Sequence, residues 1–363
     1  MSGGRRRFLA AAGTAVLGGC TAPAAEPTAF EDHERYDTTI GFAGDTMLGR
    51  NVDGRYGRAG VDPATVWGDL QPRLQSLDGV CCNLECCLSR RGDRFPDRTY
   101  YFRADPEWAV PALEAGNVKF ASLANNHMLD YGPAALRDTV DALEDGGIGY
   151  AGAGESPATA REPATVSVGD IDVAVVSFAD HYSEYGATND RPGTAYVEFD
   201  PESSDSRRIV GEAIDRANAS EPDLLVASVH WGPNWVEYPD EDYVTFSHWL
   251  VDQGVDLVHG HSAHVVQGVE RYGDGLILHD TGDIVDDYIT KEKLRNDRSF
   301  LFEVGLESGS LEELRLVPVA IDDRAVSRAD ENAAAWLRET MRDRSNPFET
   351  TYERDGDDLV LSL

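Results

Sequence analysis

The chain has 363 residues, enough for one large α/β domain, alone or with a small appendage. It carries 65 acidic side chains against 32 Lys and Arg, a formal net charge of −33 at pH 7. This charge excludes nucleic acid as a partner, because phosphate binding requires clustered cations, and a hydrophobic content of 41% speaks against a disordered chain. Since only Lys119, Lys291 and Lys293 are lysines, the surface is typical of a halophilic archaeon or a similar high-salt source.

The first 20 residues have the features of an export signal. Arg5-Arg6-Arg7-Phe8-Leu9 resembles a twin-arginine signal, and Leu17-Gly18-Gly19-Cys20 resembles a lipobox. The apolar stretch between them is too short for a transmembrane helix. We therefore expect a signal peptide over 1–20, lipidation of Cys20, and a flexible tether over 21–37. These features predict a lipid anchor on the extracellular face of the cell membrane after twin-arginine export; the alternative is an Arg-rich start that arose by chance.

The remaining chain shows alternating strand and helix patterns that predict an α/β domain over 38–325, followed by a C-terminal helix and extension over 326–363. A hairpin is expected over 165–178, with Gly169-Asp170 at its tip. Two further strands are expected around Ser308-Gly309. Helices are expected over 61–77, 107–115, 133–145, 208–219, 243–253 and 332–342, and polar loops over 88–101 and 181–192.

Apolar runs repeatedly end in side chains that can bind metal. The clearest case is Phe120–Leu123, which is followed by Asn125, Asn126 and His127. The carboxyl ends of strands are where open α/β sheets place their sites, so several such endings predict one shared site. The proposed metal ligands are Asp45, Glu85, Asn126, His230, His261 and His264.

This mixture of carboxylate, amide and imidazole suits Mn, Fe or Zn better than Ca or Mg. One or two ions are expected; a pair about 3.5–4 Å apart would clamp a phosphoryl or acyl oxygen. His127, next to Asn126, would protonate a leaving group. Taken singly, each residue has a plainer interpretation: Asn125-Asn126 can cap a loop, and His230 can be a packed core histidine.

Six motifs follow one another along the chain: Gly44-Asp45-Thr46-Met47-Leu48-Gly49-Arg50, Asn83-Leu84-Glu85, Leu123–His127 with Asp130-Tyr131-Gly132, His230-Trp231-Gly232, Gly260–Gln267 and Gly282-Asp283. Together they resemble the CapA family of poly-γ-glutamate capsule synthesis proteins, whose fold is similar to calcineurin-like metallophosphatases. The resemblance covers about residues 38–290 and implies an α/β/β/α sandwich of the metallo-dependent phosphatase type. It also implies a membrane-anchored accessory of polymer synthesis or export, with membrane-bound capsule synthase subunits as partners.

Three positions depart from the usual pattern. Met47 stands where metallophosphatases have a histidine, Ser262-Ala263 replaces His-Pro, and Asp283 replaces an asparagine. The departures leave the number of metal ions and the hydrolytic competence open. Besides the ligands, the predicted catalytic residues are His127 and Arg50, and the predicted substrate-binding residues are Asn125, Trp231 and Asp283.

Two clusters have alternative interpretations. Cys81, Cys82, Cys86 and Cys87 either form disulfides or act as small buried hydrophobic side chains beside Glu85. Arginine forks grip carboxylate and phosphate, so Arg50 and the arginines of the 88–101 loop either hold an anionic polymer or, in the loop, are simply solvated. No role is assigned to His33, His181, His248, His259 or His279.

Three functions remain in competition. The first is a hydrolase or transferase acting on a phosphoester or on the γ-glutamyl amide of poly-γ-glutamate or another anionic polymer. The second is a non-catalytic scaffold that binds the polymer and a membrane synthase. The third is a general phosphoesterase of the nucleotidase type.

Overall fold

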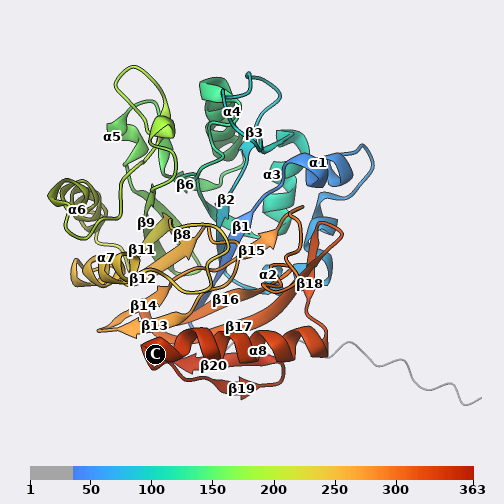
Figure 1. Cartoon of the computed structure of the whole chain (residues 1–363), viewed down its shortest axis with the longest axis vertical. Coiled ribbons are helices and arrows are strands. Elements are labelled where there is room, and N and C mark those ends of the chain that lie inside the picture. Colours follow the sequence, from blue (N-terminus) through green and yellow to red (C-terminus); the bar gives the residue numbers. More distant parts are fainter. Residues whose placement is uncertain (1–35) are drawn as a thin grey trace, which may run out of the picture. The chain divides into compact units, whose positions relative to one another are not determined.

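The computed structural model describes residues 36–363. The expected signal peptide, Cys20 and all of the tether before residue 36 lie outside the described residues. Within the described part, two mixed β-sheets pack face to face and helices cover their outer faces (Figure 1). The expected α/β/β/α sandwich is therefore confirmed.

The larger sheet has ten strands, and its parallel half carries the first three strand endings that the sequence singled out. Its order is β19 (Glu353–Asp355), β20 (Asp358–Ser362), β17 (Ser310–Asp322), β16 (Arg298–Glu307), β1 (Thr38–Thr46), β2 (Gly79–Leu84), β5 (Val118–Ser122) and β6 (Gly149–Ala151), with β15 (Asp283–Val285) on β1 and β18 (Ala325–Arg328) on β17.

The smaller sheet has six strands, and its central strands are also parallel. Its order is β13 (Val269–Tyr272), β14 (Gly275–Leu278), β12 (Leu257–His261), β11 (Leu224–His230), β9 (Ile171–Ala179) and β8 (Ala164–Val168). Strands β8 and β9 form the expected hairpin. Two short pairs complete the strands: β10 (Gly193–Thr194) with β7 (Ala153–Gly154), and β3 (Cys87–Leu88) with β4 (Arg103–Ala104).

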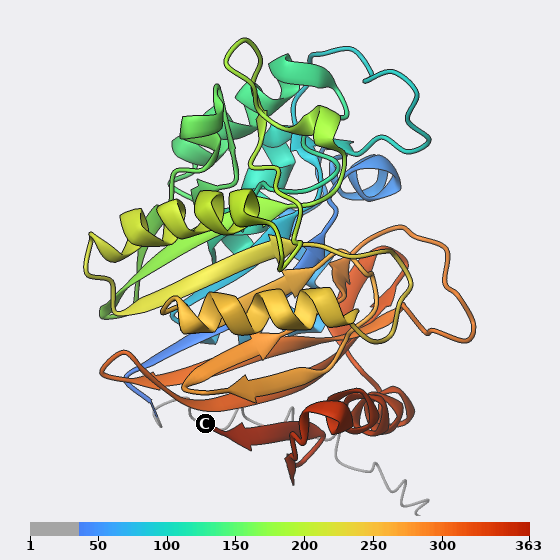
Figure 2. The same ribbon diagram turned by 60° about the vertical axis from the view of Figure 1, so that its left-hand side comes forward.

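Helices enclose the two sheets, and none of those between residues 36 and 363 is long and apolar enough to cross a membrane. Figure 2 shows two of them, α6 and α7, along the outer face of the smaller sheet. The helices are α1 (Arg50–Tyr56), η1 (Pro63–Leu70), α2 (Gln71–Ser76), α3 (Pro106–Ala115), α4 (Gly132–Asp145), α5 (Pro157–Ala160), η2 (Ser183–Tyr185), α6 (Ser204–Asn218), α7 (Glu241–Asp252), α8 (Glu331–Ser345) and η3 (Asn346–Phe348).

The layers follow from hydrophobic periodicity. In α6, Val210, Ala213, Ile214 and Ala217 recur at helical spacing and are buried against the smaller sheet. Helices α3 and α4 bury corresponding faces against the larger sheet. Alternate residues of β1 point between the sheets, where Phe42 lies in the shared core. This packing of the two sheets brings the carboxyl ends of their parallel strands together.

Two expectations about element boundaries differ from the structure. Residues 61–77 do not form one helix, because Gly68, with φ +50° and ψ −135°, interrupts η1, and α2 begins separately at Gln71. A side chain at position 68 would meet the main-chain oxygen of Val326 at 2.3 Å. The boundary expected at 325/326 falls inside β18, and residues 353–362 add two strands to the larger sheet.

The four cysteines beside Glu85 are free and buried. Burial raises the pKa of the Cys82 thiol to about 12 and that of the other three still further. Of the two interpretations left open by the sequence, the structure shows the small buried side chain and not the disulfide.

A buried ion pair ties α2 to β16. Arg73 donates to both carboxylate oxygens of Glu303, at 2.7 and 2.6 Å, and the side chains are only 9% and 2% exposed. Arg73→Ala would leave Glu303 buried and unpaired, and is expected to lower the free energy of unfolding by about 3–5 kcal/mol. Chemical denaturation measures this change. The matched control is Arg137→Ala, whose exposed pair with Glu155 contributes far less; equal losses in both variants would contradict the prediction.

Candidate metal centre

The carboxyl ends of strands from both sheets meet at one place. Asp45 lies in β1, Glu85 directly after β2, and Asn126 after β5. From the smaller sheet, His230 ends β11 and His261 ends β12. Together with His264, these residues form what we call the strand-end cluster: Asp45, Glu85, Asn126, His230, His261 and His264, all buried, with Asn126 the most exposed at 6%.

A close backbone approach fixes Asp45 at the centre of the strand-end cluster. The Asp45 N–H donates to the Gly282 carbonyl at 2.8 Å, and Asp45 pairs in register with Asp283 of β15. A Cβ at Gly44 would lie 1.9 Å from the same Gly282 oxygen, so only glycine permits this contact. The preceding glycine thus sets the position of the carboxylate.

Two groups of ligand atoms share Asp45. One group is Asp45, His230 and His261, and the other is Asp45, Glu85 and His264; within each, the ligand atoms lie within 4.8 Å of one another. Glu85 Oε1 is 4.0 Å from the Nε2 atoms of both His230 and His264. These separations are too long for hydrogen bonds and fit side chains that coordinate a common ion at about 2.0–2.2 Å each.

Unsatisfied buried atoms concentrate at the strand-end cluster. Glu85 Oε1, Asn126 Oδ1, His230 Nε2 and Asp283 Oδ2 have no hydrogen-bond partner among the described residues. Buried polar atoms are normally bonded, so four orphaned atoms at one place need an explanation. A divalent cation would supply it, since oxygen and imidazole nitrogen donors together suit Mn, Fe or Zn. The residues present therefore fit one or two metal ions.

Charge within the strand-end cluster is unevenly distributed. Burial lowers the pKa of His261 to about 4 and that of His230 well below its usual value, which favours the neutral imidazoles that bind metal. Burial and the nearby Asp45 carboxylate raise the pKa of Glu85 well above its usual value. For His264, burial acts to lower the pKa, but Asp283 and Glu85 outweigh it and the pKa is raised.

Further side chains orient the ligands. Asn83 donates to Asp45 Oδ1 at 2.7 Å, and the Tyr288 hydroxyl donates to Glu85 Oε2 at 2.7 Å. His264 Nδ1 lies 2.9 Å from Asp283 Oδ1. Such contacts fix the rotamers of ligands before a metal binds. Asp283, predicted to bind substrate, is thus buried beside a proposed ligand.

His127 lies at the edge of the strand-end cluster with one ring nitrogen committed. Its Nδ1 is 2.6 Å from Asp130 Oδ2, and its ring stacks on Phe102 with centroids 3.7 Å apart. Its Nε2 is 3.8 Å from Glu85 Oε1. Burial lowers the pKa of His127, and Asp130 opposes that shift. The arrangement leaves Nε2 as the atom that can hold or release a proton, so the predicted catalytic role has the required geometry.

The other predicted site residues lie behind or beside the ligands. Asn125 donates to Asn83 Oδ1 and accepts from the His127 N–H, and the Trp231 indole donates to the His279 carbonyl. Arg50 pairs with Asp287 at 3.3 Å, and its guanidinium carbon lies 5.3 Å from the centroid of the Phe102 ring on which His127 stacks. Their substrate-binding and catalytic roles stay predictions.

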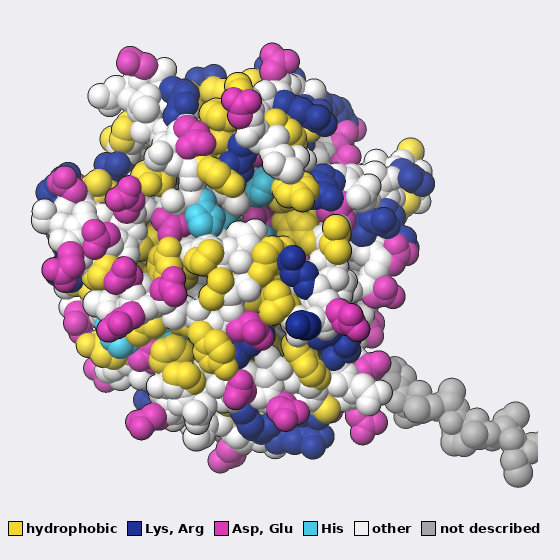
Figure 3. All heavy atoms as spheres, in the orientation of Figure 1, with side chains coloured by type: hydrophobic (Ala, Val, Ile, Leu, Met, Phe, Trp, Pro, Cys, Tyr) yellow, Lys and Arg dark blue, Asp and Glu magenta, His cyan; other side chains and the backbone are white. Residues whose placement is uncertain are grey.

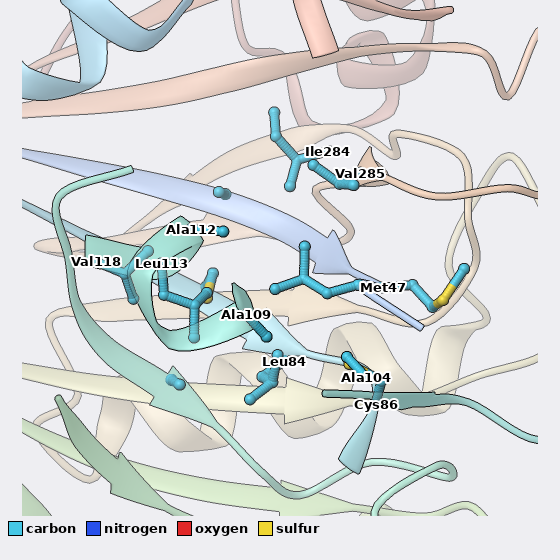
Figure 4. Packing of buried hydrophobic residues seen from close by; sticks show 14 of the residues in the cluster. Met47, Leu84, Cys86, Ala104, Ala109, Ala112, Leu113, Val118, Ile284 and Val285 are labelled. Carbon is cyan, nitrogen blue, oxygen red and sulfur yellow. The ribbon is translucent and has the colours of Figure 1, made fainter. Parts of the chain in front are cut away.

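Met47, which replaces a usual metal-binding histidine, points away from the strand-end cluster. Figure 4 shows it packed among buried hydrophobic residues that include Leu84, Cys86 and Ala104. Its sulfur accepts from the Gly49 N–H at 3.1 Å. It therefore offers no ligand here, and the ligand groups are completed by the smaller sheet instead.

His181 belongs to the site although the sequence analysis gives it no role. Its Nε2 is 3.0 Å from the Ser262 hydroxyl, its Nδ1 is 2.8 Å from Asp180, and its ring centroid is 5.5 Å from that of His230. The signal was available, because Asp180-His181 directly follows β9 and so ends a strand like the other ligands. Figure 3 shows histidine side chains at the centre of this face, bordered by hydrophobic and basic ones.

The fold and the strand-end cluster define a class: two-sheet α/β sandwich proteins with a buried carboxylate–histidine cluster compatible with metal binding. Within that class, the family model for the bacterial capsule synthesis protein PGA_cap matches residues 39–288, and the chain belongs to this family. The resemblance read from the motifs is confirmed.

Two relatives that are similar in sequence agree with this assignment. A probable polyglutamine synthesis accessory protein of Mycobacterium tuberculosis is 33% identical over 89% of this chain and 95% of its own length. The capsule biosynthesis protein CapA of Bacillus anthracis is 28% identical over 94% of this chain and 80% of its own length. Among solved structures, TT1561 of Thermus thermophilus aligns with a TM-score of 0.38 at 11% identity, covering 76% of this chain and 97% of that one.

Because Asp45 belongs to both ligand groups and Glu85 to only one, substitutions there are expected to differ in effect. The purified protein, kept in multimolar salt, should contain about one or two equivalents of Mn, Fe or Zn by elemental analysis. Asp45→Ala should remove all bound metal and Glu85→Ala the ion of its own group. Glu270→Gln is the control, since Glu270 bonds His248 and His279 outside the strand-end cluster. Unchanged metal in a folded Asp45→Ala variant would contradict the assignment.

Proposed function

We propose that this protein is a membrane-anchored accessory of poly-γ-glutamate synthesis or export, and that its metal centre cleaves or transfers the γ-glutamyl amide of the polymer. The observation that carries this proposal is the adjacency of orphaned ligand atoms and a proton-holding histidine. Asn126 Oδ1 and Glu85 Oε1 have no hydrogen-bond partner in the described chain, and His127 Nε2 lies 3.8 Å from the latter. Metal ligands with an adjacent acid are the parts that such hydrolysis needs.

The chain's own residues supply most of the chemistry. When bound, a divalent cation would act as a Lewis acid on the carbonyl oxygen of the amide. Asp130 holds the His127 ring by Nδ1, and the Tyr185 hydroxyl in turn donates to Asp130 at 2.9 Å. His127 is thereby oriented with Nε2 towards the reacting bond. It takes a proton from the attacking water or amine and delivers it to the leaving amine as the amide C–N bond breaks. The stacked Phe102 ring excludes water from one face of the imidazole.

The substrate and partners of the proposal come from family membership. Relatives carry names that refer to capsule, PGA or polyglutamine synthesis. Accessory action of this kind places the protein beside membrane-bound capsule synthase subunits, on the side where the polymer emerges. The twin-arginine and lipobox patterns of residues 1–20 support the same location through a lipid at Cys20.

In cells that make the polymer, we expect Asp45→Ala and His127→Gln each to reduce its amount or shift its chain-length distribution, because one removes the shared ligand and the other the proton donor. Gel electrophoresis of surface polymer measures both changes. His248→Gln is the matched control, a histidine bonded to Glu270 outside the strand-end cluster. If cells with an Asp45→Ala protein that binds no metal make polymer of unchanged amount and chain length, the enzymatic role is contradicted and a scaffold role is left. Turnover of small phosphoesters by the protein alone would favour a general phosphoesterase.

The anchor has its own test. Cys20→Ala is expected to move the protein from the membrane fraction to the soluble one, because a lipidated cysteine supplies the attachment. Cell fractionation followed by immunoblotting measures the distribution. A Cys20→Ala variant that stays in the membrane fraction after a high-salt wash would contradict lipidation at this residue.

A further inference from the structure

Two aromatic residues with left-handed backbones border the strand-end cluster. Tyr182 has φ +59° and Trp235 has φ +69°. Neighbouring main chain holds both: the Tyr182 carbonyl accepts from Tyr185 N–H at 2.7 Å, and the Trp235 N–H donates to Ala263 O at 2.8 Å. Bulky residues rarely adopt this conformation, and strain of this kind collects at ligand clamps.

A cationic side chain lies over each of these two aromatic rings. The guanidinium carbon of Arg98 is 3.3 Å from the Tyr182 ring centroid, and Lys291 Nζ is 4.7 Å from the Trp235 ring centroid. A cation over an aromatic face is held in place without the need for a carboxylate. Tyr182 is 42% exposed, so the first of these pairs faces solvent.

Both pairs adjoin proposed metal ligands. Arg98 Nη2 donates to the main-chain oxygen of Asn126 at 3.1 Å. The Trp235 ring centroid lies 5.1 Å from that of His264. Arg98 therefore lies beside the proposed ligand Asn126, and Lys291 lies over the ring that adjoins the proposed ligand His264.

Neither cation has an acidic partner. Among residues 36–363, no carboxylate oxygen lies within 4.0 Å of Arg98 or Lys291. Arg90 and Arg91, in the same loop as Arg98, pair with Asp105 and Asp138. Arg98 donates to the Asn126 carbonyl, but no described carboxylate balances its charge or that of Lys291, in a chain with 65 acidic side chains against 32 basic ones. An anion from outside would balance these two charges beside the proposed metal site.

We propose that Arg98 and Lys291, on Tyr182 and Trp235, are two anion-binding positions that hold two carboxylates of one γ-linked glutamate chain across the strand-end cluster. The inference rests on the proposed function and specifies its substrate. Each residue of a γ-linked chain keeps a free α-carboxylate, so the polymer offers the repeated anions that two separate cations require. The site then takes an internal segment of the polymer and not a single glutamate.

The experiment measures binding, not activity. A fluorescently labelled γ-linked glutamate oligomer is titrated into the purified full-length protein with Mn²⁺, at the lowest salt at which circular dichroism shows the native fold. R98Q and K291Q are each expected to weaken binding about tenfold, the loss of one charge-assisted contact. Because both positions hold the same chain, the double variant should lose roughly the product, about a hundredfold.

Control variants separate binding by Arg98 and Lys291, which together form the proposed clamp, from general effects of charge. R207Q removes an exposed arginine that lies over Trp249 on another face, and is expected to bind the oligomer like the wild type. R98K keeps the charge but loses the planar fork, and should fall between R98Q and the wild type. It also replaces R98Q as the informative variant if R98Q does not fold. The affinity for a labelled glutamate monomer should fall in at most one of the two variants R98Q and K291Q.

Other results would overturn the inference. Oligomer binding unchanged in R98Q and K291Q, or weakened equally in R207Q, would show that these positions do not form a clamp. Tighter binding of polyphosphate than of the γ-linked oligomer would replace the carboxylate polymer with a phosphate one. No oligomer binding by the wild type would also overturn it, and the polymer-output experiment would then show separately whether the proposed function fails.

Discussion

The site depends on one buried carboxylate. Asp45 is fully buried where strand ends of both sheets meet, and the contact of Gly44 with the Gly282 carbonyl leaves it no freedom to move outwards. Burying a charge without compensation is costly. In the described chain Asn83 donates to one oxygen, the Ser262 N–H donates to the other at 3.2 Å, and His264 lies 3.1 Å from that second oxygen. A divalent cation held with Glu85 and the neighbouring histidines would add to this compensation, so the requirements of the fold and of a metal coincide at this residue.

The two sheets contribute differently to that compensation. The larger sheet supplies oxygen ligands, Asp45, Glu85 and Asn126, whereas the smaller sheet supplies nitrogen ligands. A mixed centre therefore forms only when the sheets are packed against each other. This explains how the family fold accommodates Met47: the histidine expected in that position would come from the larger sheet, while here the imidazoles of the smaller sheet complete both ligand groups.

Charge around the centre runs against the charge of the whole chain. A net charge of −33 repels an anionic polymer at long range, although multimolar salt screens this repulsion. At short range, binding of an anion depends on the nearby side chains. Two cations beside the strand-end cluster, Arg98 and Lys291, lie over aromatic rings and not against carboxylates. In the proposed clamp, an acidic protein would receive a polyanion at one place although its net charge is negative.

The sequence by itself indicated the sandwich and the family through the resemblance of its six motifs. It also picked out the six candidate ligands, because polar side chains that end apolar strands carry their position in the sequence pattern. It did not determine the partners of those ligands. His181 reaches Ser262 and Tyr288 reaches Glu85 only because separate loops pack over one edge, and no local periodicity encodes such contacts. It also left the cysteines between two states, which burial resolved. The pairing of Arg98 with Tyr182 and of Lys291 with Trp235 was decided by tertiary structure alone, since each joins loops distant in sequence.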